Sequence, residues 1–288
     1  MIMAKCNVCF RHCEIAEGRL GFCGARTCKN GTVVADNYGQ ITSLALDPIE
    51  KKPLYRFHPG TNILSVGSYG CNLRCPFCQN YSISWSDHAL NCRNQTEFIS
   101  PEDLVKAALN CRNRGNIGLA FTYNEPLIGY EYVRDTAKMA HEYGFVNVLV
   151  SNGTAELSVL EEILPYIDAM NIDLKGFTDR YYRDVLQGNR QMVMEFIQEA
   201  VKGCHVELTM LIVPGENDTE DEILALSKWI ASLKGLPDGN TGRDIPLHIT
   251  RFFPRFHMLD RKPTDVSLVY RLADVAREQL RYVFVGNC

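Results

Sequence analysis

Three cysteines, Cys71, Cys75 and Cys78, follow one another with the spacing Cys-x3-Cys-x2-Cys. With twelve cysteines in 288 residues, random placement would produce this spacing only ~0.02 times per chain. In a reducing compartment, thiols spaced in this way indicate metal binding or catalysis rather than disulfides. Three thiolates can bind three irons of a [4Fe-4S] cube and leave the fourth iron open to another ligand. The alternative is a zinc site completed by a distant fourth ligand, because structural zinc normally has four.

Four more cysteines, Cys6, Cys9, Cys13 and Cys23, lie in a short glycine-containing segment. Such a segment cannot build a core alone, so a bound metal would supply folding energy. Three alternatives remain open: a zinc ion, a second iron–sulfur cluster that could relay electrons, or no metal, with reactive thiols or an oxidative link. Cys28 is a spare thiol or a substitute for one of the four.

Short apolar runs after residue 60 predict the strands that position these residues. They cover residues 62–66, 117–121, 146–150, 168–173, 205–212, 246–250 and 281–285. Helices are predicted between them, with start and stop signals at Ser100-Pro101 and Gly115, over residues 126–143, after Thr219, and from Thr264 or Asp265.

Alternating strands and helices predict parallel pairing with right-handed crossovers. The expected fold is α/β, a partial (β/α)6-type TIM barrel over residues 61–288, preceded by a small cysteine-rich N-terminal module and extension over residues 1–60. In such barrels the chemistry gathers at the carboxyl ends of the strands, and the three-cysteine segment directly follows the first predicted strand.

The three-cysteine segment has Phe77 before its last cysteine and so resembles the signature of the radical S-adenosylmethionine (SAM) superfamily. Further stretches look like the AmmeMemoRadiSam-system radical SAM proteins, of the pyruvate formate-lyase activating enzyme-like branch; they cover residues 47–55, 78–80, 122–126, 171–176 and 282–287. The resemblance implies a [4Fe-4S] cluster on the three cysteines, SAM on its open iron, and Phe77 among the cofactor-binding residues. Reductive cleavage of SAM would give a 5′-deoxyadenosyl radical that abstracts a hydrogen atom.

The resemblance also implies that Asn124 and Glu125, after the second predicted strand, contact SAM. Activases have Gly-Gly-Glu-Pro in this place, so Glu125 matches while Asn124 replaces a glycine. A carboxylate near the SAM amino group makes physical sense. The alternative is a glutamate that caps the first turn of a helix.

Ser151 and Asn152, after the third predicted strand, are similar to part of the activase pattern Asp-Thr-Asn-Gly. Val150 stands where that pattern has the aspartate that helps to bind a monovalent cation. A cation site beside SAM would therefore depend on oxygens of Ser151 and Asp173. An ordinary turn is the alternative for this segment.

Asp173 and Lys175 match the activase pattern Asp-Leu-Lys, and strand alternation places them on one face. Contact with SAM would satisfy both charges; the alternative is a mutual salt bridge. His248 and Arg251 lie near the place where related activases present a histidine to the ribose, but a lone histidine is often structural.

The leading hypothesis for function is hydrogen abstraction from a protein or peptide, which would make the chain a radical SAM oxidoreductase similar to activating enzymes. A barrel with few strands leaves a lateral opening that admits a large substrate. The second hypothesis is a radical SAM reaction on a small molecule. The third, of another class, is an iron–sulfur electron-transfer or metal-binding protein that does not cleave SAM.

The composition predicts no nucleic-acid or membrane partner. The net charge is −4 with a pI near 6.0, and no apolar stretch has membrane-spanning length. With no secretory signal at the start, a cytoplasmic location is expected. The resemblance implies an electron donor such as flavodoxin or ferredoxin, and partners of the Memo and AMMECR types.

Overall fold

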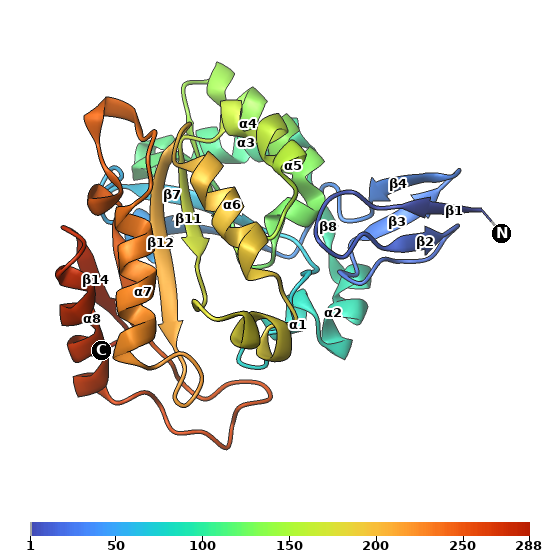
Figure 1. Ribbon diagram of the computed structural model, residues 1–288. Helices are drawn as coiled ribbons and strands as arrows, with labels where there is room; N and C mark the ends of the chain where they lie inside the picture. Colours follow the sequence, from blue (N-terminus) through green and yellow to red (C-terminus); the bar gives the residue numbers. More distant parts are fainter. Residues whose placement is uncertain (1) are drawn as a thin grey trace.

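The computed structural model describes residues 2–288, and its centre is one eight-stranded sheet (Figure 1). The order of strands is β14-β13-β12-β11-β10-β9-β7-β6, and every neighbouring pair is parallel except β6 with β7. The carboxyl ends of the parallel strands therefore lie along one edge, as in the predicted partial TIM barrel. The strands are β6 (Ser43–Pro48), β7 (Asn62–Gly67), β9 (Asn116–Phe121), β10 (Val146–Ser151), β11 (Ala169–Asp173), β12 (His205–Ile212), β13 (Leu247–Arg251) and β14 (Val283–Gly286).

Helices connect the parallel strands and lie along one face of the sheet (Figure 1). Their buried apolar side chains belong to the main hydrophobic core. No helix in the described part of the chain is long and apolar enough to cross a membrane. The longer helices are α3 (Pro101–Asn110), α4 (Tyr130–Glu142), α5 (Leu157–Ile163), α6 (Arg190–Ala200), α7 (Glu220–Ala231) and α8 (Val266–Arg277). The short helical turns are η1 (Ile49–Lys51), η2 (Arg93–Gln95), η3 (Arg112–Arg114), η4 (Pro126–Gly129), η5 (Leu164–Tyr166), η6 (Tyr181–Val185), η7 (Pro237–Gly239) and η8 (Gly242–Asp244).

The predicted helix starts are confirmed by their side-chain caps. Ser100 accepts a hydrogen bond from the amide of Asp103, and Thr219 accepts one from the amide of Glu222. The helix predicted over residues 126–143 is present in two consecutive parts, the short turn η4 and the helix α4, which meet at Gly129. Gly129 interrupts the helix, and a Cβ at this position would lie 2.5 Å from Oδ1 of Asn37.

The N-terminal residues form two small hairpins beside the sheet, drawn in blue in Figure 1. β1 (Met3–Lys5) pairs with β2 (Glu14–Ala16), and β3 (Arg26–Lys29) pairs with β4 (Thr32–Ala35). β5 (Gln40–Ile41) pairs with β8 (Glu97–Phe98), and two short helices follow the three-cysteine segment, α1 (Tyr81–Ser84) and α2 (Asp87–Cys92). The division into 1–60 and 61–288 stays a prediction; β6, which precedes residue 60, belongs to the central sheet.

The second face of the sheet is filled near its amino-terminal side by the connection between β6 and β7. Ile49 and Leu54 from this connection are buried against Ala120, Val148 and Ala169 of three neighbouring strands. This packing fills the amino-terminal side of the barrel with apolar side chains. The polar side chains discussed next gather toward the carboxyl ends of the strands.

Candidate active site at the carboxyl ends of the strands

Residues 68–80, called here the three-cysteine loop, follow β7 and carry Cys71, Cys75 and Cys78. The amide of Cys78 donates to the carbonyl of Cys75 at 3.2 Å, which forms a tight turn. Burial raises the pKa of Cys71 well above its ordinary value, and raises the pKa of Cys75 to about 12. Neighbouring thiols add to both shifts. Such thiols remain protonated until a metal displaces their protons, so the donor set fits a thiolate-bound cluster.

The three-cysteine loop offers three thiols, one fewer than the four ligands of a structural zinc site. Among the side chains that the structure describes, no three His, Cys, Asp or Glu converge on one metal ion. A cubane attaches each protein sulfur to a different iron and can leave one iron open. The donor set of the loop therefore fits a [4Fe-4S] cluster better than zinc.

Two asparagines fix the three-cysteine loop to the end of β9. Asn124 accepts from the amide of Ser68 at 3.0 Å and donates to the carbonyls of Tyr69 and Gly70 at 3.1 and 3.2 Å. Asn80 donates to the carbonyl of Tyr123 at 2.8 Å. The side chain of Asn124 thus holds the backbone just before Cys71, where activases have a glycine.

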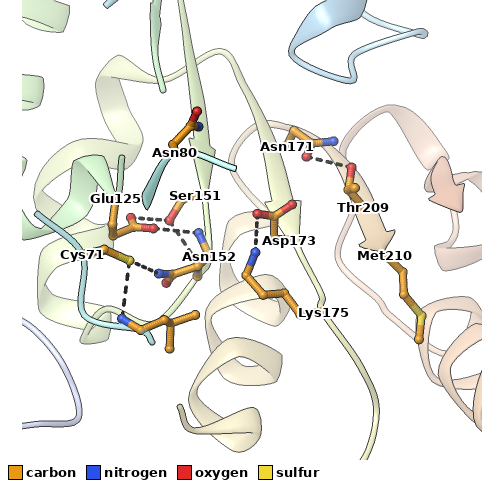
Figure 2. Close-up of polar contacts among 12 residues, drawn as sticks. Cys71, Asn80, Glu125, Ser151, Asn152, Asn171, Asp173, Lys175, Thr209 and Met210 are labelled. Atoms are coloured by element: carbon orange, nitrogen blue, oxygen red, sulfur yellow. Dashed lines mark hydrogen bonds and ion pairs between the residues drawn. The ribbon is translucent and has the colours of Figure 1, made fainter. Parts of the chain in front are cut away.

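Glu125 lies buried between the ends of β9 and β10 (Figure 2). Its carboxylate accepts from the hydroxyl of Ser151 at 2.7 Å, the amide of Asn152 at 2.8 Å and the amide of Leu127 at 3.1 Å. Burial nevertheless raises the pKa of Glu125 to about 7. Glu125 does cap η4, and a cation bound beside it would favour its ionised form.

Asn152 connects this carboxylate to the three-cysteine loop. Its side-chain nitrogen lies 3.8 Å from the sulfur of Cys71 (Figure 2). The same nitrogen donates to Oδ1 of Asn72 at 2.9 Å. Asn72 is buried and donates in turn to the carbonyl of Thr154 at 2.9 Å. The sequence gave no reason to single out Asn72, because its role depends on a loop 80 residues away.

Asp173 and Lys175 form an ion pair at the end of β11, with 2.7 Å between Oδ2 and Nζ (Figure 2). Burial alone would lower the pKa of Lys175, but the charges of Asp173 and Cys75 raise it well above its ordinary value. The predicted alternative of a mutual salt bridge is therefore present. The ammonium also lies close enough to the cysteines to favour their thiolate forms.

Phe77 and Arg251 each have a contact within the protein. Phe77 is buried in the three-cysteine loop and meets Phe252 edge to face, with ring centroids 6.4 Å apart. The guanidinium of Arg251 donates to the carbonyl of Thr264 at 2.8 Å, in the segment before α8. A cofactor contact stays a prediction for both residues.

His248 lies near the start of β13, deep in the sheet, and is hydrogen-bonded to the buried carboxylate of Glu207 at 2.6 Å. Glu207 also accepts from His205 at 3.0 Å and from the amides of Tyr55 and Arg56 at 3.0 and 2.7 Å. Although burial opposes ionisation, these donors lower the pKa of Glu207 to about 2. The ring of His248 thus already has a protein partner, and its ribose contact stays a prediction.

An open groove of about 510 Å³ runs beside the three-cysteine loop. Its walls come from the N-terminal module, the three-cysteine loop, and the segments that follow β11, β12 and β13. Its lining contains both apolar and charged side chains: Phe22, Arg74, Pro76, Trp85, Asp184, Val185, Gln187, Glu216, Met258 and Arg261. Pro76 places the groove directly beside Cys75, and its carbonyl accepts from the amide of His257 at 2.8 Å.

The structure brings the four N-terminal cysteines together. Cys6, Cys9, Cys13 and Cys23 all line one small pocket. Asn72 of the three-cysteine loop also lines this pocket, so the two groups of cysteines are neighbours. Cys28 lies outside it, on β3, with its sulfur 3.4 Å from Oε2 of Glu17.

Comparison with known protein families finds that residues 65–227 match the Radical SAM superfamily. An uncharacterised protein of Methanocaldococcus jannaschii is 40% identical over 98% of this chain and 81% of its own length. A candidate glycyl-radical enzyme activating enzyme of the same organism is 27% identical over 53% of this chain and 62% of its own length.

Among solved structures, a domain of pyruvate-formate lyase-activating enzyme from Bacteroides vulgatus has a similar fold. Its TM-score is 0.50 at 15% identity, with 58% of this chain and 98% of that domain covered. At this identity the likeness concerns the fold alone. The matched region begins in β7 and contains the three-cysteine loop, Glu125, Asn152 and Asp173.

Proposed function

Since the chain belongs to the radical SAM superfamily, we propose that it cleaves SAM reductively and abstracts a hydrogen atom from a protein or peptide. A [4Fe-4S] cluster, when bound, supplies the electron that splits SAM into methionine and a 5′-deoxyadenosyl radical. In this proposal Cys71, Cys75 and Cys78 are the ligands of that cluster. The observation that carries it is the position of these thiols, beside Glu125 and Lys175 at the carboxyl ends of the strands.

The polar residues around the loop are proposed to bind and orient SAM. Ser151 and Asn152 already align the carboxylate of Glu125, and burial disfavours its ionised form. The ammonium group of SAM would stabilise that ionised form. Lys175 and Asp173 offer opposite charges for the carboxylate and hydroxyl groups. Asn124 acts on the backbone before Cys71 and so positions the loop.

The groove beside Pro76 indicates the class of substrate. An enclosed pocket would suit a small molecule, because such sites bury most of their ligand. Here the groove is open to solvent and combines Phe22, Trp85 and Met258 with both signs of charge. An extended peptide, with its own mixture of side chains, suits this lining. We therefore propose an activity of the activating-enzyme type, on a protein or peptide substrate.

The first test is 5′-deoxyadenosine formation by anaerobically reconstituted, reduced protein. Wild type is expected to form it, and Cys75→Ala is expected to lose it completely. Cys111→Ala is the matched control, because Cys111 is a partly buried cysteine outside both groups. Full SAM cleavage by the Cys75→Ala protein would refute the assignment of the cluster ligands.

The second test identifies the hydrogen donor. The enzyme is incubated with extracts of cells grown in deuterated medium, separated into protein and low-molecular-mass fractions. Deuterium in 5′-deoxyadenosine is expected with the protein fraction. Transfer from the low-molecular-mass fraction alone would contradict the peptide proposal and support the small-molecule hypothesis.

The remaining features of the proposal concern the surroundings of the enzyme. A flavodoxin or ferredoxin is proposed as electron donor, and proteins of the Memo and AMMECR types as partners. The abundance of free thiols agrees with a reducing compartment, so we place the protein in the cytoplasm. The N-terminal cysteines are proposed to hold a second metal centre, zinc or an iron–sulfur cluster.

A further inference from the structure

The N-terminal pocket is built by two adjacent turns of the chain. The loop between β1 and β2 supplies Cys6, Cys9 and Cys13, and it is closed by a hydrogen bond from the amide of Cys6 to the carbonyl of Cys13 at 2.9 Å. The turn before β3 supplies Cys23. Cys6, Cys9 and Cys23 are buried. Four thiols from separate turns thus face one space, which is the donor set of a metal centre.

The lining of this pocket suits a metal held by four thiols, which is the donor set of both tetrahedral zinc and a [4Fe-4S] cluster. Apolar Val8, Ile15 and Ile128 belong to the lining, together with Arg11 and Asn72. What favours a redox-active cluster over zinc is the position of the pocket beside the three-cysteine loop.

The pocket is joined to the three-cysteine loop by the main chain. The amide of Cys71 donates to the carbonyl of Cys23 at 3.1 Å, so one hydrogen bond connects a cysteine of each group. Gly70 permits this approach, since a Cβ there would lie 2.7 Å from the same carbonyl oxygen. The path from one sulfur to the other contains two cysteine residues and this single hydrogen bond.

Two arginines lie between the groups of cysteines and reinforce the junction. Arg11 and Arg74 stack on the ring of Phe22, at 3.4 and 3.7 Å from its centroid. Arg11 donates to the carbonyl of Asn72 at 2.9 Å, and Arg74 donates to the carbonyl of Cys71 at 2.9 Å. Two cations at this place offset the negative charge that thiolate-bound clusters carry on either side.

We propose that Cys6, Cys9, Cys13 and Cys23 hold a second iron–sulfur cluster that passes electrons to the cluster of the three-cysteine loop. In each step the N-terminal cluster loses one electron and the cluster of the three-cysteine loop gains it. The N-terminal cluster is then reduced again by a donor of the ferredoxin or flavodoxin class. Electron relay rests on the proposed function, whereas the identity of the N-terminal cluster does not.

The identity is tested by metal analysis of full-length, anaerobically reconstituted protein. Wild type is expected to contain about eight irons, and a Cys71→Ala/Cys75→Ala/Cys78→Ala variant about four, as two [4Fe-4S] clusters require. Cys28→Ala is the matched control, because Cys28 is a buried thiol of the same module outside the pocket; it is expected to keep the wild-type content. Zinc without iron in the triple variant, or no metal there, would overturn the proposal.

The relay is tested by electron paramagnetic resonance (EPR). With both clusters reduced, the wild-type spectrum is expected to be broadened by spin coupling, because Cys23 and Cys71 are directly hydrogen-bonded. After mixing with a reduced ferredoxin, a Cys6→Ala/Cys9→Ala variant is expected to lose the fast phase in which the SAM-binding cluster is reduced. A wild-type spectrum equal to the sum of two separate clusters, or an unchanged fast phase, would overturn the relay. None of these readouts requires SAM cleavage, so a failure of the proposed function would be seen separately.

Discussion

Replacement of Glu125 by glutamine should remove a pH dependence from SAM binding. The pKa of Glu125 is raised by burial to about 7, from an ordinary value of 4.5. The charged form that attracts the SAM ammonium is therefore present above pH 7 and is lost as the pH falls through 7. The ionised fraction changes from ~0.1 at pH 6 to ~0.9 at pH 8, so the affinity of wild type should rise about tenfold over this range.

The assay is the SAM dissociation constant of anaerobically reconstituted protein at pH 6, 7 and 8, followed by the change in the EPR signal. Glu125→Gln should bind more weakly at pH 8 and show a flat profile. Glu222→Gln is the control. Glu222 is also a buried carboxylate, and burial raises its pKa too, but it accepts a hydrogen bond from the amide of Phe177 and has no proposed contact with SAM. Wild-type affinity and an unchanged profile in Glu125→Gln would refute the role of this carboxylate.

Two further predictions concern the framework of the site. Gly70→Ala should destabilise the protein by about 1–3 kcal/mol, because Gly70 has φ +92° and a Cβ would lie 2.7 Å from the carbonyl oxygen of Cys23. The midpoint of thermal unfolding measures this loss. A midpoint equal to that of wild type would contradict the close packing at Gly70. Glu207→Ala should cost about 3 kcal/mol, since it leaves His248 and the amides of Tyr55 and Arg56 without their buried acceptor. Chemical denaturation at neutral pH tests the second change, and a loss below about 1 kcal/mol would show that water replaces the carboxylate.

The parallel strands could be predicted because their burial leaves a local signal. Each is a short apolar run with turn residues at its ends, and the observed bounds of β7 and β12 agree with the predicted runs within one residue. β6 was not predicted, because its residues Ser43–Pro48 are partly exposed and it lies at the edge of the sheet. Helix α4 begins later than expected because Gly129 packs against Asn37, which is far away in the sequence.

The candidate site also has one part that the sequence predicts and another that depends on contacts between distant segments. The spacing of Cys71, Cys75 and Cys78 is local and could be read directly from the sequence. The bonds that Asn72 makes to Asn152 and Thr154 join segments about 80 residues apart, so no short pattern predicts them. His248 was expected near the ribose of SAM, whereas its observed partner, Glu207, comes from another strand that no short pattern connects with it.

The central claim is that the cluster of the three-cysteine loop keeps one iron open for SAM. It is tested most directly by EPR of the reduced Cys6→Ala/Cys9→Ala protein, which leaves Cys71, Cys75 and Cys78 intact, before and after addition of SAM. The account predicts a [4Fe-4S] signal whose g values change when SAM is added. A signal that SAM leaves unchanged, or the absence of iron from this protein, would contradict the account.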